Sequence, residues 1–340
     1  MQNPEDHGFL SGVRTIRNYC FCFLLFLGFL LVFFFADFGT IDLGNEDYSL
    51  YSMRYDVEHL PMTEAGMTIR YGQQLFANTA HLLGKQNTKE PYVGNVLSCT
   101  NCHLDNGTRA YGIPLIGVDK RFPQYRARED KIGNLQERIN GCFERSMNGR
   151  KLAQDSQEMK ALVAYIGWLG RYVLPNEKIN GRGLKPLILP NRAVDLAHGK
   201  AIYQKHCTLC HGKNGEGQKN GQGSYDYPPV WGENSYNNGA GMTRVITAAQ
   251  FIKYNMPYGV THDSPVLTNE EAYDVAGYIN QQQRPLKNSL VLDFPNRLKK
   301  PVSSPYPPYS DPFSQKQHQL GPFQPIMDYY TREYSISKSK

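Results

Sequence analysis

The sequence predicts an all-α protein built from two tandem helical domains. Two C-x-x-C-H segments, Cys99-Thr100-Asn101-Cys102-His103 and Cys207-Thr208-Leu209-Cys210-His211, lie one in each half of the chain. In both halves a stretch with helical periodicity precedes the segment, a loop rich in glycine follows it, and a capped amphipathic helix comes last. The same order of elements, found twice, indicates an internal duplication.

The length of 340 residues suits two compact domains of roughly 100 residues each, with extensions. We divide the chain into a cytoplasmic N-terminus (1–18), a transmembrane anchor or signal peptide (19–36), an acidic spacer (37–59), a first domain (60–174), a linker rich in proline and glycine (175–192), a second domain (193–290) and a tail rich in proline and tyrosine (291–340).

The net charge of +6 is modest. Binding of nucleic acid would need basic residues clustered on one face, so we expect no nucleic-acid partner. A small anionic substrate or an acidic protein partner fits this charge.

An uncharged run of 17 residues extends from Tyr19 to Phe35, which is the short end of what spans a bilayer. Arg14 and Arg17 precede the run and acidic residues follow it, which predicts that the rest of the chain lies outside the cytoplasm. A cleaved signal peptide is the alternative, but its apolar core is normally about 7–15 residues and ends at an A-x-A-like site. A single alanine, Ala36, follows the run here, and there is no such cleavage site. We therefore expect a periplasmic protein held to the inner membrane by an uncleaved helix.

The first domain is expected to begin with a helix over residues 64–84, where apolar residues fall at roughly helical spacing. Residues 134–145 also have the pattern of a helix. A closing helix over 155–172 is predicted from a capping box of Asp155 and Glu158 followed by an apolar stripe.

The second domain repeats this order. Helices are predicted over 195–205, 243–255 and 268–283, and Thr268-Asn269-Glu270-Glu271 forms a capping box at the start of the last one. The tail from Pro301 to Lys340 contains seven prolines, so we expect either an extended strap over the domains or disorder.

The cysteines indicate the chemistry. Of the seven, Cys20 and Cys22 lie in the apolar run, four form the two C-x-x-C-H segments, and only Cys142 is left. C-x-x-C-H is the attachment signature of c-type haem, in which two thiols add across the haem vinyl groups and the histidine reaches the iron. Zinc frameworks usually place their cysteine pairs about 15–20 residues apart, and a thioredoxin-type pair needs a βαβ setting. We therefore expect two cytochrome c-like domains with two covalently bound haem c groups, attached through Cys99, Cys102, Cys207 and Cys210.

Each iron needs a second axial ligand or an open position in addition to His103 or His211. The candidates in the second domain are Met242, Lys253, Met256 and His262. Met256 precedes Pro257 at a predicted helix end, where small c-type domains commonly present a methionine. Ligation by histidine and methionine raises the reduction potential and suits a haem that transfers electrons.

In the first domain Met147 and Met159 could be ligands, but Cys142 is the stronger candidate. It follows a glycine, so its backbone can approach the ring, and the arginines around it favour a thiolate. Helical spacing places Arg138 and Ser146 on the Cys142 face, at i−4 and i+4. The alternatives are that Cys142 is a small apolar core residue and that the arginines are solvated or hold haem propionates. The candidates for propionate binding are Lys120, Arg121, Arg126 and Arg128.

Two C-x-x-C-H modules with Arg-Ile-Asn-Gly-Cys-Phe-Glu-Arg-Ser-Met-Asn-Gly between them resemble the dihaem thiosulfate dehydrogenases. These are periplasmic c-type cytochromes, and some also act as tetrathionate reductases. The resemblance covers roughly residues 60–285. It implies a catalytic haem with His103 and Cys142 as axial ligands, and an electron-exit haem with His211 and Met256.

The resemblance also implies an active-site arginine and serine, which correspond to Arg138 and Ser146. Some relatives have a lysine ligand before the methionine, where this chain has Asn255. The expected reaction converts two thiosulfate ions into tetrathionate and two electrons. Arg138 and Arg150, with Arg145, would offset the repulsion between the two dianions, and Cys142 would form a covalent adduct with the first.

Two other functions stay open from the sequence. One is a dihaem electron-transfer cytochrome with no substrate of its own, which a Cys142 away from iron would favour. The other is a sulfur-oxidation cytochrome that acts on sulfur bound to a carrier protein, which would need a wide docking surface. In each case a soluble or membrane-bound electron acceptor, a cytochrome or similar protein, is the expected partner.

Overall fold

The computed structural model describes residues 17–28, 55–85, 87–220 and 225–339. The chain forms two compact units, residues 1–49 and residues 50–340. In the first unit, residues 17–28 form a helix with exposed apolar side chains, and the rest of the expected anchor, 29–36, lies outside the described residues. So does most of the expected spacer, 37–54. Within the described part of the chain, the structure contains no helix with the length and apolar character needed to cross a membrane.

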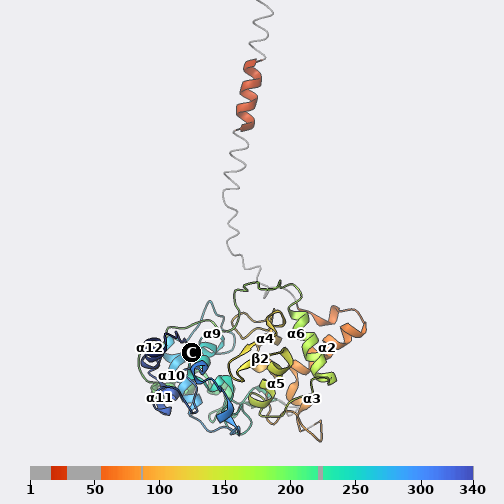
Figure 1. The fold of residues 1–340 in the computed structure, drawn as a ribbon. Helices are drawn as coiled ribbons and strands as arrows, with labels where there is room; N and C mark the ends of the chain where they lie inside the picture. Colours follow the sequence, from red (N-terminus) through yellow and green to blue (C-terminus); the bar gives the residue numbers. More distant parts are fainter. Residues whose placement is uncertain (1–16, 29–54, 86, 221–224, 340) are drawn as a thin grey trace, which may run out of the picture. The chain divides into compact units, whose positions relative to one another are not determined.

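The first domain is built on two packed helices, α2 (Glu64–Ala77) and α6 (Gln157–Leu169), which lie side by side in Figure 1. Gly72 allows their close approach, because a Cβ at this position would lie 2.0 Å from the Ala161 carbonyl oxygen. Leu75 and Phe76 of α2 point into the core of this domain. A large side chain in place of Gly72 would therefore separate the two helices.

The helix predicted over 64–84 is two helices. α2 ends at Ala77, and α3 (Thr79–Leu83) follows Asn78, whose φ of −124° and ψ of 35° are not helical. The break brings the Thr79 hydroxyl to 3.2 Å from Cys99 Sγ and to 3.1 Å from the Cys99 N–H, which donates to it. The interruption therefore ties these helices to the first C-x-x-C-H segment.

The start of α6 also differs from the prediction. Ser156, not Asp155, is the N-cap residue, because its hydroxyl accepts a hydrogen bond from the Met159 N–H at 3.2 Å. The capping box predicted from Asp155 and Glu158 is therefore wrong. Serine and aspartate are both good N-cap residues, so the sequence alone does not decide which of these two neighbours caps the helix.

An irregular chain connects α3 to the helix that carries Cys142. It contains η2 (Cys99–Asn101), α4 (Leu104–Gly107), η3 (Asp119–Arg121) and an antiparallel hairpin of β1 (Gln124–Arg126) and β2 (Lys131–Gly133). The hairpin leads directly into α5 (Leu135–Arg145), where Asn134 and Glu137 form a capping box. The helix predicted over 134–145 is confirmed. The hairpin shows that the fold is mostly, rather than wholly, helical.

The second domain has the same order of elements. It contains α7 (Leu196–His206), α8 (Thr208–His211), a hairpin of β3 (Gln218–Lys219) and β4 (Tyr225–Tyr227), η4 (Gly241–Thr243), α9 (Val245–Asn255) and α10 (Asn269–Asn280). α10 packs against both α7 and α9. The predicted capping box is confirmed, since Thr268 accepts from the Glu271 N–H and Glu271 accepts from the Thr268 N–H.

The tail is folded onto the second domain. Its elements are η5 (Leu290–Leu292), η6 (Arg297–Lys299), α11 (Gln315–Leu320) and α12 (Gln324–Tyr334). Phe323, Ile326 and Tyr330 are buried in the core of the second domain. The prediction of an extended strap or disorder, made for residues 301–340, is wrong where α11 and α12 form, because these apolar residues recur at helical spacing and Pro325 lies in the first turn of α12, where proline is tolerated.

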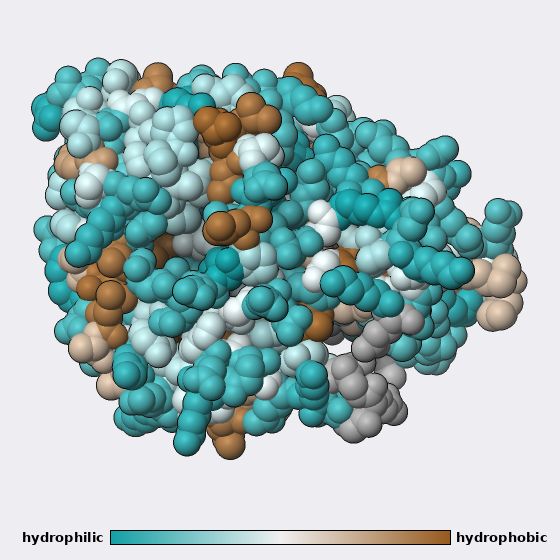
Figure 2. Space-filling model, turned by 90° about the horizontal axis from the view of Figure 1, so that it is seen from below, coloured by the Kyte–Doolittle hydropathy of each residue, from teal (hydrophilic) through white to brown (hydrophobic). Residues whose placement is uncertain are grey.

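Each domain has its own apolar core, but one loop belongs to both. Tyr236 and Ala240 come from the second domain and are buried in the core of the first. Figure 1 shows α5 between the α2–α6 pair and the helices of the second domain. The face drawn in Figure 2 is mainly hydrophilic, and its apolar side chains form small separate groups, as is ordinary for a folded protein.

Candidate active site

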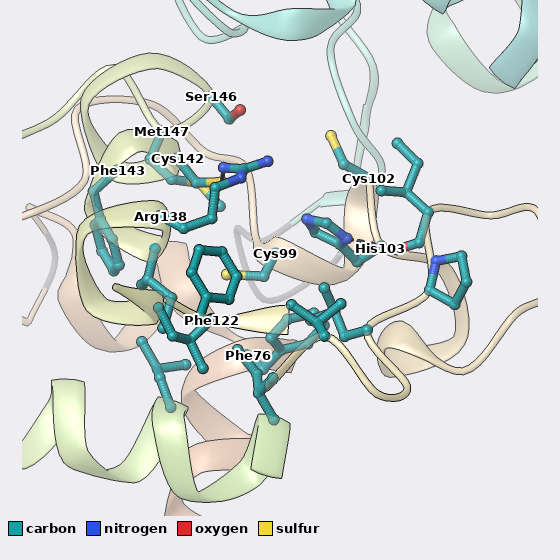
Figure 3. A pocket seen from close by; sticks show the side chains of 18 of the residues that line it. Phe76, Cys99, Cys102, His103, Phe122, Arg138, Cys142, Phe143, Ser146 and Met147 are labelled. Atoms are coloured by element: carbon teal, nitrogen blue, oxygen red, sulfur yellow. Dashed lines mark hydrogen bonds between the residues drawn. The ribbon is translucent and has the colours of Figure 1, made fainter. Parts of the chain in front are cut away.

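A cavity of about 320 Å³ lies in the first domain between the first C-x-x-C-H segment and α5 (Figure 3). Its lining includes Cys99, Cys102 and His103 from the segment and Arg138, Cys142 and Ser146 from α5 and its C-cap. Most of its exposed lining is apolar, as a haem pocket requires. The fold thus brings six of the residues selected from the sequence into one cavity.

A backbone carbonyl orients the histidine of this segment. His103 Nδ1 lies 2.7 Å from the Ile113 carbonyl oxygen, so this nitrogen carries the proton and donates it. The other ring nitrogen, Nε2, is left to interact with Cys142 or to bind a metal. The linker holds Ile113 in turn, because the Ile113 N–H donates to the Gly183 carbonyl at 3.1 Å. The φ of Ile113 is +56°, which β-branched residues rarely adopt, so its surroundings must impose it.

Three cysteines share the cavity, but their electrostatic surroundings differ. Burial raises the pKa of Cys99 and of Cys102 to about 12, so both are neutral thiols before any attachment. Burial alone would also raise the pKa of Cys142, but the charge of Arg138 and the interaction with His103 lower it to about 6. The thiolate is the form that binds metals and attacks sulfur, so Cys142 differs from the other two in the way that both roles require.

Arg138 is the nearest charged neighbour of the Cys142 sulfur. Its Nη1 lies 2.8 Å from Cys142 Sγ, and the charge of the thiolate raises the pKa of Arg138. Ser146, one turn further along the helix, lines the same cavity (Figure 3). The i−4 and i+4 spacing therefore places all three side chains where the sequence predicted.

The structure does not bring Arg145 and Arg150 to the cavity. Arg145 is buried and donates to a carboxylate oxygen of Asp293 at 2.7 Å. Arg150 lies 3.9 Å over the Tyr92 ring and donates to the Glu90 carbonyl at 2.8 Å. Both arginines are thus occupied by partners outside the cavity.

A different arginine, which sequence reasoning missed, lies near Arg138. Arg244 is the N-cap residue of α9 in the second domain. Burial, and after it the charges of Arg128 and Arg138, lower the pKa of Arg244 to about 10. Among the described residues no carboxylate forms an ion pair with Arg244. Only the docking of the second domain places it there, so no local pattern in the sequence could indicate it.

The cations expected to hold propionates are mostly paired within the protein. Lys120 pairs with Asp119 at 3.1 Å, Arg126 with Glu129 at 2.9 Å, and Arg128 with Asp293. Arg121 lines the cavity, and so does Arg182 from the linker, which the sequence did not suggest. These two are the arginines best placed to meet carboxylates on a group bound in the cavity.

The second C-x-x-C-H segment repeats the arrangement of the first. Cys207, Cys210 and His211 lie at the start and within α8, and His211 Nδ1 is 2.8 Å from the Pro228 carbonyl oxygen. Burial lowers the pKa of His211, which favours the neutral ring that metals bind. Met256 directly follows α9 and packs against the core of this domain.

The other ligand candidates have partners elsewhere. Lys253 Nζ donates to the Leu267 carbonyl at 2.9 Å, the His262 ring packs on Tyr111 with centroids 4.8 Å apart, and Met242 packs against the core of the first domain. Met159 is fully buried in that core, whereas Met147 lines the first cavity. Ligation by Cys142 and by Met256 therefore stays a prediction, with Met147 as the remaining alternative in the first domain.

The donor set fits haem c at both segments: two thiols, then a histidine whose Nδ1 is fixed by a carbonyl. Family models match both halves of the chain, "SoxA/TsdA, cytochrome c domain" at residues 84–172 and "Cytochrome c" at residues 196–283. Two tandem helical domains with these sites define a dihaem c-type cytochrome, which carries two covalently bound haem c groups.

Named relatives narrow this class. The chain is 40% identical to a thiosulfate dehydrogenase of Stutzerimonas stutzeri over 68% of this chain and 72% of the relative. It is 42% identical to a thiosulfate dehydrogenase of Allochromatium vinosum over 67% of this chain and 82% of the relative. The chain belongs to the thiosulfate dehydrogenase family.

A solved structure agrees with this assignment. The fold matches thiosulfate dehydrogenase (TsdBA) from Marichromatium purpuratum, in its "as isolated" form, with a TM-score of 0.64 and 38% sequence identity. The match covers 70% of this chain and 51% of that chain, so about half of that structure has a counterpart here.

Proposed function

We propose that this protein oxidises two thiosulfate ions to one tetrathionate ion at the cavity of the first domain, with two electrons leaving through the second. The observation that carries the proposal is the position of Cys142 Sγ, which lies 2.8 Å from Arg138 Nη1 in the cavity that also contains Cys99, Cys102 and His103. The relatives named thiosulfate dehydrogenase support the choice of substrate.

We infer that His103 and Cys142 would bind the iron of the haem at the first site, and that His211 and Met256 would bind the iron at the second. Cys99 and Cys102, and Cys207 and Cys210, hold the two groups covalently. When bound, the haem groups accept the electrons and pass them to a soluble or membrane-bound acceptor, such as another cytochrome.

The site must bring two dianions together. Arg138 is beside the reacting sulfur, and Arg244 adds a second positive charge from the second domain. Their charge-assisted hydrogen bonds to sulfonate oxygens would offset the repulsion between the substrates. Ser146, whose hydroxyl lines the same wall, would donate a further hydrogen bond to a sulfonate oxygen.

Cys142 is the nucleophile in this scheme. Its thiolate forms a sulfur–sulfur bond with the sulfane sulfur of the first thiosulfate, and two electrons are released in that step. The sulfane sulfur of the second thiosulfate then attacks the bonded sulfane sulfur, tetrathionate leaves, and Cys142 leaves as a thiolate. A covalent intermediate divides one difficult coupling into two easier steps.

Replacement of the nucleophile tests the proposal. Cys142→Gly is expected to retain both haem groups, because their attachment uses other cysteines, and to lose turnover at least about 1,000-fold. Haem content and tetrathionate formation are measured on the same sample. Gln136→Ala, on the same helix, is the control and should keep normal turnover. A Cys142→Gly protein that retained both haem groups and near wild-type activity would contradict the mechanism.

We also propose that the two domains lie in the periplasm and are attached to the inner membrane through residues 19–36. The support is the uncharged run from Tyr19 to Phe35 with arginines before it and acidic residues after it. Cell fractionation tests this proposal. In the variant, a cleavable export signal replaces residues 1–36. This protein should be found in the soluble periplasmic fraction and no longer in the membrane fraction. A truncated protein that stayed with the membrane would overturn the anchor.

A further inference from the structure

We propose that the second domain positions the catalytic helix through Asn237, a buried residue in the loop between β4 and η4. The inference rests on the proposed role of Cys142, which lies one turn before the end of α5. The last carbonyl groups of a helix have no partner within the helix and must find one elsewhere. The partners of these carbonyls in α5 show what fixes the helix.

The turn after α5 satisfies the first of these groups. The Met147 N–H donates to the Cys142 carbonyl at 3.0 Å, and the Gly149 N–H donates to the Phe143 carbonyl at 2.9 Å. Asn148 between them has a φ of +46°, the left-handed conformation that commonly ends a helix. This part of the C-cap is local to the first domain.

The next two carbonyls accept hydrogen bonds from the second domain, although that of Arg145 also accepts a longer local one from the Asn148 N–H at 3.3 Å. Asn237 Nδ2 donates to the Glu144 carbonyl at 2.9 Å, and the Asn237 N–H donates to the Arg145 carbonyl at 3.1 Å. Asn237 Nδ2 also donates to Asn148 Oδ1 at 3.1 Å. One residue of the second domain thus contacts both the end of α5 and the turn that follows it.

The loop has no freedom to move away from α5. Asn237 is 1% exposed, and its Oδ1 accepts the Gly239 N–H at 3.1 Å. Tyr236 and Ala240, on either side, are buried in the core of the first domain. The amide of Asn237 is therefore held rigidly while it donates.

A second amide connects the same loop to the next carbonyl. Asn95 Nδ2 donates to the Ser146 carbonyl at 2.8 Å and to the Ser235 carbonyl at 3.0 Å. The Ser146 backbone and the loop are therefore joined through one buried side chain. The position of the end of α5, and with it the chemistry of the first domain, thus depends on hydrogen bonds that only the docked second domain supplies.

Asn237 touches neither the cavity nor the reacting sulfur, so it is a positioning residue. A loose end of α5 would displace Cys142 and Ser146 together relative to His103, which belongs to a different segment. Displacement of reacting groups by about 1 Å can cost about 100-fold in rate. Substrate binding by exposed arginines should be much less sensitive to such a shift.

Three variants of the holoprotein test the inference. Asn237→Ala removes both side-chain donations, and Asn237→Asp keeps the shape but replaces the donor with an acceptor facing two oxygens. Asn238→Ala is the matched control, because Asn238 is in the same loop but its side chain accepts from the Lys287 N–H at 2.8 Å and does not bond to α5. We expect a loss in kcat of roughly 10- to 100-fold for the first two, with KM for thiosulfate changed less than threefold.

Two further measurements separate positioning from general instability. The electron paramagnetic resonance signal of the ferric first haem should change in both Asn237 variants and stay unchanged in Asn238→Ala. Amide hydrogen exchange of residues 144–149 should accelerate in the Asn237 variants alone. If the resonance signal and the exchange rates of the Asn237 variants were both the same as in the wild type, the inference would be overturned. This outcome does not depend on whether the protein has thiosulfate activity. A wild type without such activity would instead contradict only the proposed function.

Discussion

At the scale of single residues, the site depends on how one sulfur is made different from two others nearby. Loss of solvent around Cys99 and Cys102 raises their pKa values to about 12. Cys142 is in the same cavity but has Arg138 at 2.8 Å, and its pKa falls to about 6. The charge of Arg138, together with the interaction with His103, therefore favours the thiolate at Cys142 and not at the other two cysteines.

This contact predicts a large effect for Arg138→Gln. Loss of a hydrogen bond to a charged group costs about 1.5–3 kcal/mol, which corresponds to a fall in kcat/KM for thiosulfate of about 10- to 150-fold. Arg138→Lys should lose less, because it keeps the charge without the fixed fork of donors. Steady-state kinetics on fully haem-loaded protein measures both variants.

Arg150→Gln is the informative comparison. The sequence alone predicts that this change lowers kcat/KM for thiosulfate. The contacts of Arg150 with Tyr92 and Glu90 predict instead that kcat/KM stays within about twofold of wild type. Equal losses in the Arg138 and Arg150 variants would show that the contacts of Arg138 do not determine its role.

The same residues show how far the sequence could predict the site. Arg138, Cys142 and Ser146 follow from helical spacing, because all three belong to one helix and its cap. Arg145 belongs to that helix too, but it turns to Asp293, which lies in the tail. Arg244 enters from the second domain. Local spacing cannot indicate contacts that form only when distant segments dock.

At the scale of elements, the predicted helices are present but several of their ends differ. Asn78 divides the first helix, and Ser156 caps α6 in place of Asp155. At α6 the deciding interaction is a single side-chain hydrogen bond, which Ser156 makes in competition with an equally good neighbouring N-cap residue. At Asn78 the backbone leaves the helical conformation without a side-chain cap. The capping box at Thr268 was predicted correctly, because it combines two reciprocal hydrogen bonds within four residues. The capping box of Asn134 and Glu137 has the same form but was not identified from the sequence.

One element contact predicts a dependence of stability on pH. Asp274 of α10 is fully buried and accepts hydrogen bonds from Arg192 at 2.7 Å, from His198 Nδ1 at 2.8 Å and from the Asp195 N–H at 2.9 Å. Burial alone would raise the pKa of Asp274, but these partners lower it below its usual value. The folded pKa is thus below the unfolded one, so the pairing stabilises the protein above about pH 3.9 and is lost as the pH falls through the folded value.

Asp274→Asn is therefore expected to lower the free energy of unfolding by about 1–3 kcal/mol at pH 7, because Arg192 keeps only its pair with Glu270 and loses the buried carboxylate. The difference from wild type should shrink as the pH falls below about 4. Urea unfolding followed by circular dichroism at both pH values gives the two differences. A difference that was the same at pH 7 and in acid would show that the ionised carboxylate is not the stabilising group.

At the scale of the whole molecule, the tail connects the two domains as well as completing the second. The Phe294 N–H donates to the Arg128 carbonyl at 2.8 Å, and Asp293 bonds to the side chains of both Arg128 and Arg145. The prolines of this segment suggested a strap or disorder, yet its apolar residues provide part of the core. Composition gave the wrong prediction here because spacing, not proline content, decides whether a segment can pack.

Asp293 is the residue on which this connection is concentrated. It is 5% exposed and accepts hydrogen bonds from Arg145 at 2.7 Å and from the Tyr306 hydroxyl at 2.8 Å, in addition to its ion pair with Arg128. Burial alone would raise its pKa, but the charges of Arg128 and Arg145 lower it, so the group is ionised at neutral pH. Asp293→Asn would leave two cations without their common carboxylate.

We expect Asp293→Asn to lower the free energy of unfolding by about 3–5 kcal/mol, since breaking a buried ion pair leaves charge uncompensated. In a chain of this size that corresponds to a fall in Tm of roughly 5–8 °C. The matched control is Asp328→Asn on the exposed side of α12, which should change the free energy by less than about 0.5 kcal/mol. The double variant Asp293→Asn with Arg145→Gln should lose less than the sum of the single losses, because the second change removes the unpaired charge. Additive losses, or an Asp293 variant as stable as the Asp328 control, would mean that the tail does not hold the two domains together through this carboxylate.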